Sequence, residues 1–254
     1  MILAVDIGNT NTVIGCCKDG KILFSERIST VQTATPLEYA ALIRTACELN
    51  GTDHREIHGS IISSVVPSLT FTVKEALRRL TGTVPMAVGP GIKTGVSIMI
   101  DDPAQLGSGM VVNAAAAVKY YPLPLIIIDM GTATTLSVIN EKGCYIGGMI
   151  APGLRVSLDS LVAKASQLPH IAPEPPKRLI GRNTVECLKS GALYGCAGMI
   201  DSLIGRINEE MGCVCTAVAT GAAADTVIPL CRSSIITDSD LPLKGLMLIY
   251  DKNK

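Results

Sequence analysis

Short apolar runs alternate along the chain with longer stretches whose apolar residues recur at helical spacing, a pattern typical of a mixed α/β protein. The short runs predict strands at residues 2–5, 21–25, 60–65, 125–128, 145–149 and 214–219. The longer stretches predict helices at residues 35–49, 69–80, 111–121, 152–166 and 185–210, the last one interrupted at Gly191, Gly195 and Gly198. A final apolar stretch at residues 243–249 closes the chain.

The start of the chain recurs in its second half, displaced by the 123 positions that separate residue 6 from residue 129. Four residues match in one register: Asp6 with Asp129, Gly8 with Gly131, Thr12 with Thr135 and Gly20 with Gly143. Each copy has an apolar strand ending in Asp, a Thr-rich turn containing Gly, a second β-branched strand and a Gly turn, which predicts a β-hairpin. Because a helix follows each hairpin, the sequence predicts an α/β fold of two tandem ribonuclease-H-like lobes, as in actin-like ATPases, with a cleft between them. We expect the lobes at residues 1–115 and 116–254, bridged by the helix at 111–121.

The repeated turns carry groups that suit the phosphates of a nucleotide. Short donors come from Asn9, Thr10, Asn11 and Thr12 in the first turn and from Thr132, Thr134 and Thr135 in the second. Asp6 and Asp129 would face one another across the cleft, and their charge beside a triphosphate requires a bound cation. The alternative is that each Asp only caps its own turn. The symmetric pairing favours phosphate and cation binding.

Charge and composition exclude several other classes of function. Lys plus Arg number 22 and Asp plus Glu number 22, so no strong field attracts nucleic acid or an anionic membrane. Apolar runs such as residues 123–128 are far shorter than the roughly 20 residues that cross a bilayer. The first residues read as a strand and not as a signal peptide, so we expect a cytoplasmic location.

Other nucleotide and metal motifs are absent from the sequence. The nine cysteines show no C-x-x-C spacing, which favours reduced thiols over a zinc site. The chain contains no G-x-x-x-x-G-K-[ST] loop and no G-x-S-x-G elbow, so neither a Walker-type nucleotide site nor a hydrolase triad is predicted.

Six segments, in order and over nearly the whole chain, resemble signatures of the type III pantothenate kinase family. They are residues 6–15 (DIGNTNTVIG), 63–67 (SSVVP), 88–95 (VGPGIKTG), 129–135 (DMGTATT), 147–154 (GGMIAPGL) and 180–186 (IGRNTVE). The resemblance implies a fold of the acetate-and-sugar-kinase, Hsp70 and actin class. It also implies transfer of the γ-phosphoryl group of ATP to pantothenate, giving 4'-phosphopantothenate, the first step of coenzyme A biosynthesis.

The same resemblance assigns residues to roles. The ATP-binding set would be Asp6, Ile7, Gly8, Asn9, Thr10, Asn11, Thr12, Val13 and Thr132. Asp6 would hold magnesium through the phosphates, and Asp129 would hold a monovalent cation, K⁺ or NH₄⁺. The substrate-binding set would be Ile100, where the family often has Tyr, with Gly107, Ser108, Gly109, Met110 and Thr184. Such kinases are homodimers, and Thr184 would contact pantothenate near the subunit interface.

The chain departs from the family at the position of the catalytic base. Where the family reads Gly-Ala-Asp-Arg, this sequence reads Gly-Ser-Gly-Met at residues 107–110. In the family the Asp accepts the proton of the attacking hydroxyl and the Arg binds the polar end of pantothenate; Gly109 and Met110 do neither. A second departure is Ala222, where the family has the second residue of a Gly-Gly pair near the adenosine. We therefore expect impaired turnover.

Three functional hypotheses follow from these observations. The first is a pantothenate kinase, active or impaired. The second is a non-catalytic nucleotide-binding relative with a regulatory role, and the third is a kinase for another small hydroxylated acceptor. Gly109 and Met110 are the residues that discriminate among them.

Overall fold

The computed structural model describes residues 1–254, which form two compact units. The first unit contains Met1–Tyr120 together with Asp240–Lys254, and the second contains Tyr121–Ser239. The chain therefore divides differently from the expected ranges 1–115 and 116–254, because its last segment packs in the first unit. None of the helices combines the length and the apolar character that a bilayer crossing requires.

A five-stranded sheet with the order β3-β2-β1-β4-β5 forms the centre of the first unit. Its strands are β1 (Ile2–Ile7), β2 (Asn11–Lys18), β3 (Lys21–Ser29), β4 (Gly59–Ser64) and β5 (Met86–Ala87). The helices are α1 (Pro36–Leu49), α2 (Pro67–Thr81), α3 (Ser108–Tyr120) and α7 (Leu241–Asn253). Short elements are β6 (Ser97–Ile98), η1 (His54–Glu56) and η2 (Pro103–Gln105). β1 pairs antiparallel with β2 and parallel with β4.

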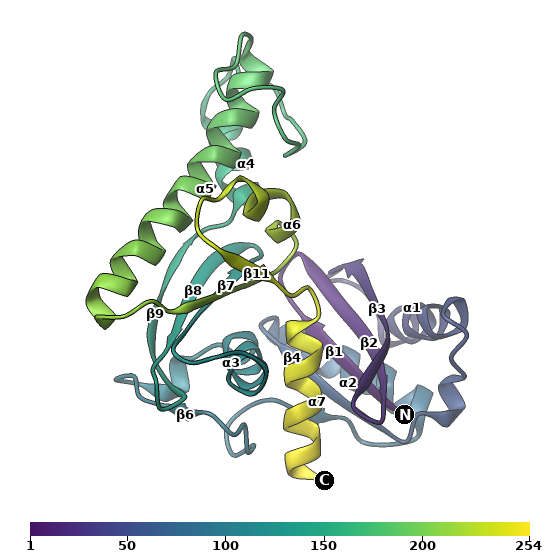
Figure 1. Cartoon of the computed structure of the whole chain (residues 1–254). Helices are drawn as coiled ribbons and strands as arrows, with labels where there is room; N and C mark the ends of the chain where they lie inside the picture. The colour runs from purple at the N-terminus through teal and green to yellow at the C-terminus, as the bar shows by residue number, and fades with distance from the viewer. The chain divides into compact units, whose positions relative to one another are not determined.

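Helices cover both faces of this sheet (Figure 1). On one face Leu3, Val5 and Ile7 of β1 belong to a core that includes residues of α1 and α2. On the other face Ala4 and Ile61 pack with residues of α3 and α7. This alternation along β1 is the period of two that a strand requires. The helix predicted at residues 111–121 therefore lies in the core of the first unit.

Close packing of α7 on α3 places the C-terminal segment in the first unit. A Cβ added to Gly245 would lie 2.0 Å from the carbonyl oxygen of Val112, so only glycine permits the two helices to approach this closely. Leu243, Leu246 and Ile249 of α7 are fully buried. The apolar spacing of residues 243–249 is thus the buried face of a helix.

The strands of the second unit follow the corresponding order, β9-β8-β7-β10-β11, in a second sheet. Its strands are β7 (Leu125–Met130), β8 (Ala133–Ile139), β9 (Cys144–Pro152), β10 (Thr216–Thr220) and β11 (Ile235–Thr237). Its helices are α4 (Leu154–Lys164), α5 (Thr184–Met211), α6 (Ala224–Val227) and η3 (Ile228–Leu230). β7 pairs antiparallel with β8 and parallel with β10, as β1 does with β2 and β4. The predicted α/β fold with two tandem ribonuclease-H-like units is confirmed.

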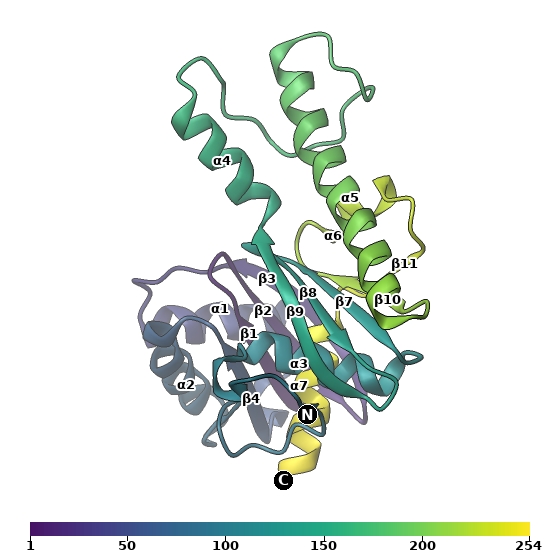
Figure 2. The ribbon, with the colours of Figure 1, turned by 90° about the vertical axis from the view of Figure 1, so that its left-hand side faces the viewer.

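The long helix α5 is continuous, so the interruption predicted from its glycines is wrong. A glycine inside a helix costs about 1 kcal/mol relative to alanine. Leu193, Ala197, Ile200 and Ile204 are buried along α5 and compensate for this cost. The N-terminal half of α5 and the antiparallel α4 extend beyond their sheet (Figure 2).

The strand registers correct one match of the internal repeat. Ile7 pairs with Thr12 in the first hairpin, whereas Met130 pairs with Thr134 in the second. The second turn is therefore one residue shorter, and Thr134, not Thr135, is the counterpart of Thr12. The third strands restore the offset of 123, because Thr12 pairs with Ile28 in the first unit and Thr134 pairs with Ala151 in the second.

Candidate nucleotide and substrate site

The first candidate turn joins β1 to β2 and follows directly on Asp6. The backbone amide of Gly8 donates to the carbonyl of Asn11 at 3.0 Å. A Cβ at Gly8 would lie 2.9 Å from that same carbonyl oxygen, closer than side chains approach, which explains the glycine. Asn9 and Thr10 at the tip are exposed. The turn therefore presents short polar groups to solvent at the end of β1.

Thr30, directly after β3, braces this turn. Its hydroxyl donates to the carbonyl of Gly8 at 2.7 Å and lies 2.9 Å from the hydroxyl of Thr12. Its backbone amide donates to the carbonyl of Thr10 at 2.9 Å. Sequence reasoning missed Thr30, although it directly follows β3, the strand whose last residue pairs with the first residue of β2 beside the turn.

The second candidate turn joins β7 to β8 and has corresponding backbone bonds. The amide of Gly131 donates to the carbonyl of Ala133 at 3.0 Å, and the amide of Gly153 donates to the carbonyl of Thr132 at 3.0 Å. Gly131 and Thr132 are exposed. The two units thus build their candidate turns in the same way.

Gly221 packs closely against Asp129 in the second unit. Gly221 has φ of +97°, a conformation that favours glycine. A Cβ there would lie 2.7 Å from Oδ1 of Asp129 and 2.6 Å from the amide nitrogen of Met130. In the sheet Asp129 lies between Thr135 of β8 and Thr220 of β10. The hydroxyl of Thr220 is buried without a hydrogen-bond partner.

Thr12 and Thr134 should respond differently to replacement by valine. Thr12 Oγ1 is paired with Thr30, but the counterpart of Thr30 is Gly153, so the buried hydroxyl of Thr134 has no partner. We expect Thr12→Val to lower the free energy of unfolding by about 1 kcal/mol. Thr134→Val should leave it unchanged or raise it by up to about 1 kcal/mol, since it removes an unpaired buried hydroxyl. Urea unfolding of both variants measures the difference, and equal losses would contradict this account of the turns.

The segment 107–110 lies beside Asp6 in the first unit. Ser63 of β4 is the register partner of Asp6, so the two residues are neighbours in the sheet. The hydroxyl of Ser63 donates to that of Ser108 at 3.0 Å, and Ser108 donates to the carbonyl of Ser64 at 3.0 Å. The N-terminus of α3 is thereby fixed at the end of the sheet that carries Asp6.

Ser108 is committed to this structural role, and Gly109 and Met110 follow it in the first turn of α3. Asp102, the nearby acid in sequence, caps η2 by accepting from the amide of Ala104 at 3.1 Å. A Cβ at Gly109 would meet no atom within 4 Å. The site of the missing base is therefore open space.

The two remaining predicted substrate residues lie in different units. Ile100 is partly buried in a bend between β6 and η2 of the first unit. Thr184 is exposed at the first position of α5, on the part that extends beyond the second sheet (Figure 2). It lines an apolar groove of about 330 Å³ between α4 and α5, with Leu158, Leu161 and Leu188. Within the second unit, Thr184 is therefore remote from the turn that carries Thr132.

Comparison with known proteins identifies the family. The family model for type III pantothenate kinase matches residues 2–206. The chain is 40% identical to the type III pantothenate kinase of Halalkalibacterium halodurans and 39% identical to that of Moorella thermoacetica, with both chains of each pair fully covered. The chain belongs to the type III pantothenate kinase family.

Solved structures support the fold of this family member. The activator of 2-hydroxyisocaproyl-CoA dehydratase from Clostridium difficile matches with a TM-score of 0.58 at 14% identity, over 98% of this chain and 93% of that one. The ROK hexokinase of Thermus thermophilus matches with a TM-score of 0.50 at 13% identity, over 98% and 97%. At these identities the likeness is one of fold alone.

Proposed function

We propose that the protein is an ATP:pantothenate phosphotransferase that forms 4'-phosphopantothenate at a reduced rate. The observation that carries this proposal is the turn of residues 8–12, which is braced by Thr30 and exposed at its tip. It follows Asp6, whose sheet neighbour Ser63 bonds the N-terminus of α3. Phosphoryl transfer depends mainly on positioning and charge neutralisation, and these are the features that the chain retains.

ATP and magnesium fit the groups of the first turn. The exposed amides and hydroxyls of Asn9 and Thr10 suit phosphate oxygens, and the glycine at position 8 lets the backbone fold back on itself. The partly exposed carboxylate of Asp6 would hold Mg²⁺ through its water shell, since Mg²⁺ prefers carboxylate, phosphate and water oxygens. Bound magnesium would neutralise charge on the transferring group.

The second turn would also bind nucleotide phosphate. Thr132 offers an exposed hydroxyl, and Asp129 would hold a monovalent cation, K⁺ or NH₄⁺. No group of three or more His, Cys, Asp or Glu residues gathers into a metal cluster, so cation binding would depend on single carboxylates and on the phosphates.

A homodimer would complete the substrate site. Thr184 is remote from the Thr132 turn of its own unit, and it borders an apolar groove on α4 and α5. Packing of that groove on a second copy would bring Thr184 to a pantothenate site near the subunit interface. A cytoplasmic location stays a prediction from the sequence.

The acceptor end of the site explains the reduced rate. Gly109 has no carboxylate to accept the hydroxyl proton of pantothenate, and Met110 has no cation for its polar end. Ser108 does not replace the base, because its hydroxyl proton is donated to the carbonyl of Ser64. The absence of a carboxylate at residue 109 and of a cation at residue 110 is also the observation that favours the alternative, a non-catalytic nucleotide-binding relative.

Titration calorimetry with ATP tests the nucleotide half of the proposal. We expect the protein to bind ATP in the presence of Mg²⁺, and Asp6→Asn to weaken that binding about tenfold, since a magnesium-linked carboxylate is lost. With EDTA in place of Mg²⁺ the two proteins should bind ATP alike. Asp101→Asn is the matched control, with an exposed acid outside the turn. Absence of any ATP binding by the unaltered protein would refute the proposal.

A further inference from the structure

Thr30 makes three hydrogen bonds to the candidate phosphate turn and belongs to none of the family signatures. Its hydroxyl contacts the carbonyl of Gly8 and the hydroxyl of Thr12, and its amide contacts the carbonyl of Thr10. The residue is only partly buried and directly follows the last residue of β3. So many bonds from one residue fix the path of the turn at two successive places.

The direction of the side-chain bonds follows from the number of protons. A threonine hydroxyl has one proton to donate. Gly8 offers only its carbonyl oxygen, so Thr30 must donate there, at 2.7 Å. Thr12 must then donate to Thr30, at 2.9 Å. The result is a directed chain from Thr12 through Thr30 to the backbone of Gly8.

This chain sets the orientation of the peptide group between Gly8 and Asn9. The peptide is trans, because the one cis bond of the protein is Leu123-Pro124. In a trans peptide the carbonyl and the following N–H point in opposite directions. With the Gly8 carbonyl turned to Thr30, the Asn9 N–H points away from β3, and it donates to no group of the chain. An exposed amide is thus held in one orientation and left available for an anion.

The shorter turn of the second unit is held without a side chain. Gly153 is the counterpart of Thr30, and its amide bonds the carbonyl of Thr132 as Thr30 bonds that of Thr10. A Cβ at Gly153 would lie 2.3 Å from the carbonyl oxygen of Gly131. The second turn is therefore braced by direct backbone packing, and only the first depends on a hydroxyl.

We propose that Thr30 is a positioning residue for nucleotide binding, which turns the Gly8–Asn9 peptide so that the Asn9 N–H meets a phosphate oxygen of ATP. The inference rests on the proposed function, since it assumes that this turn binds phosphate. It goes beyond that function in assigning an energetic role to a residue outside the turn.

The test compares ATP, ADP and adenosine, each measured by calorimetry on the protein and on Thr30→Val. We expect Thr30→Val to lose about tenfold or more in affinity for Mg·ATP and Mg·ADP, as when a hydrogen bond to a charged group is lost. Affinity for adenosine, which has no phosphate, should change by less than about twofold. Thr30→Ser keeps the hydroxyl and should restore phosphate affinity.

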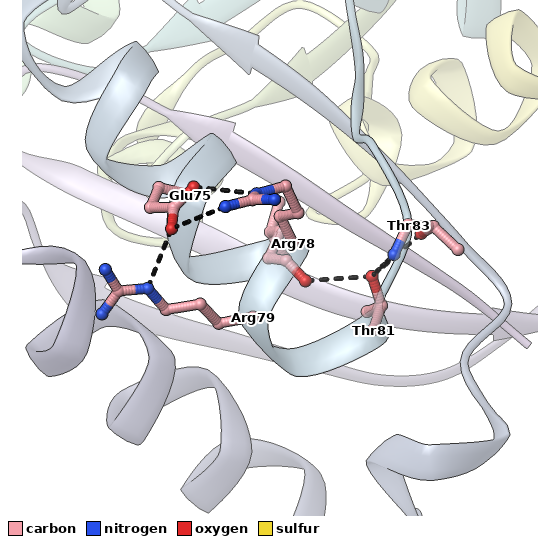
Figure 3. A network of polar contacts seen from close by, with 6 residues as sticks. Glu75, Arg78, Arg79, Thr81 and Thr83 are labelled. Atoms are coloured by element: carbon pink, nitrogen blue, oxygen red, sulfur yellow. Dashed lines mark hydrogen bonds and ion pairs between the residues drawn. The ribbon is translucent and has the colours of Figure 1, made fainter.

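A matched control comes from Thr81 at the end of α2. Its hydroxyl donates to the carbonyl of Leu77 at 2.9 Å and lies 2.9 Å from the hydroxyl of Thr83, so it makes the same two kinds of bond as Thr30 (Figure 3). Thr81→Val should cost similar stability with unchanged nucleotide affinity. If Thr81→Val weakens ATP binding as much as Thr30→Val, the effect is general and the inference is overturned.

Two further outcomes separate this inference from the proposed function. Normal ATP binding by Thr30→Val would overturn the role of Thr30 alone, whereas no ATP binding by the unaltered protein would overturn both. Should Thr30→Val fail to fold, the ¹⁵N amide resonance of Asn9 in the unaltered protein decides. It is expected to shift with Mg·ATP and not with adenosine, and an unmoved resonance would overturn the inference.

Discussion

Replacing Gly109 by Asp together with Met110 by Arg is expected to raise the kcat for pantothenate phosphorylation about 10²- to 10⁴-fold. That range is the usual contribution of a general base. The carboxylate would accept the hydroxyl proton as the phosphoryl group transfers, and the guanidinium would bind the polar end of pantothenate, which should also lower the KM. Steady-state assays of ATP consumption with varied pantothenate measure both effects.

The structure leaves room for these side chains. A Cβ at position 109 meets no atom within 4 Å, and the position lies in the first turn of α3, where an acidic residue is favoured by the helix dipole. Gly109→Asn with Met110→Arg is the matched control, since Asn has the shape of Asp and no basic carboxylate. An unchanged rate for the Asp variant, or an equal gain for the Asn variant, would refute this account of residues 107–110.

Gly221→Ala should be strongly destabilising. Its backbone is in a left-handed conformation that costs alanine about 1–2 kcal/mol, and the added Cβ would contact the Met130 amide and the Asp129 carboxylate. We expect the free energy of unfolding to fall by about 2–4 kcal/mol in all, because neither the backbone of Gly221 nor that of Met130 can move aside without disturbing the sheet. ATP-dependent activity should fall with it, as Asp129 is displaced.

A glycine of α5 provides the control for Gly221. Gly205 lies in the helix with no atom within 4 Å of an added Cβ, so Gly205→Ala should stabilise the protein by about 0.5–1 kcal/mol. Urea unfolding and ATP consumption are measured for both variants. If Gly221→Ala is as harmless as Gly205→Ala, the close approach of Gly221 to Asp129 is not required.

The hairpins, the α/β fold and the helix bounded by Thr35 could be predicted from the sequence because their signals are local. Thr35 begins α1 with a capping box to Glu38, and Pro36 is the first residue of that helix. Likewise, Glu75, Arg78 and Arg79 mark the solvent-exposed face of α2. Hydrogen bonds from Arg78 and Arg79 lower the pKa of Glu75 to about 2 (Figure 3). Such patterns involve residues within one or two turns of each other.

The features that sequence reasoning missed depend on contacts between distant residues. The match of Thr12 with Thr135 failed because an ungapped offset does not register a turn shortened by one residue when the third strands restore the offset. The placement of α7 in the first unit depends on its packing against Val112, more than 130 positions earlier. Thr30, and the close approach of Gly221 to Asp129, were missed because each residue acts on a turn formed by a different strand pair.

Single-turnover phosphorylation of pantothenate, with the protein in excess over ATP, tests the central claim most directly. Mass spectrometry should detect 4'-phosphopantothenate that forms slowly, requires Mg²⁺, and is lost with Asp6→Asn. ATP that binds but yields no phosphorylated pantothenate over many hours would contradict the kinase and leave a nucleotide-binding protein without this activity.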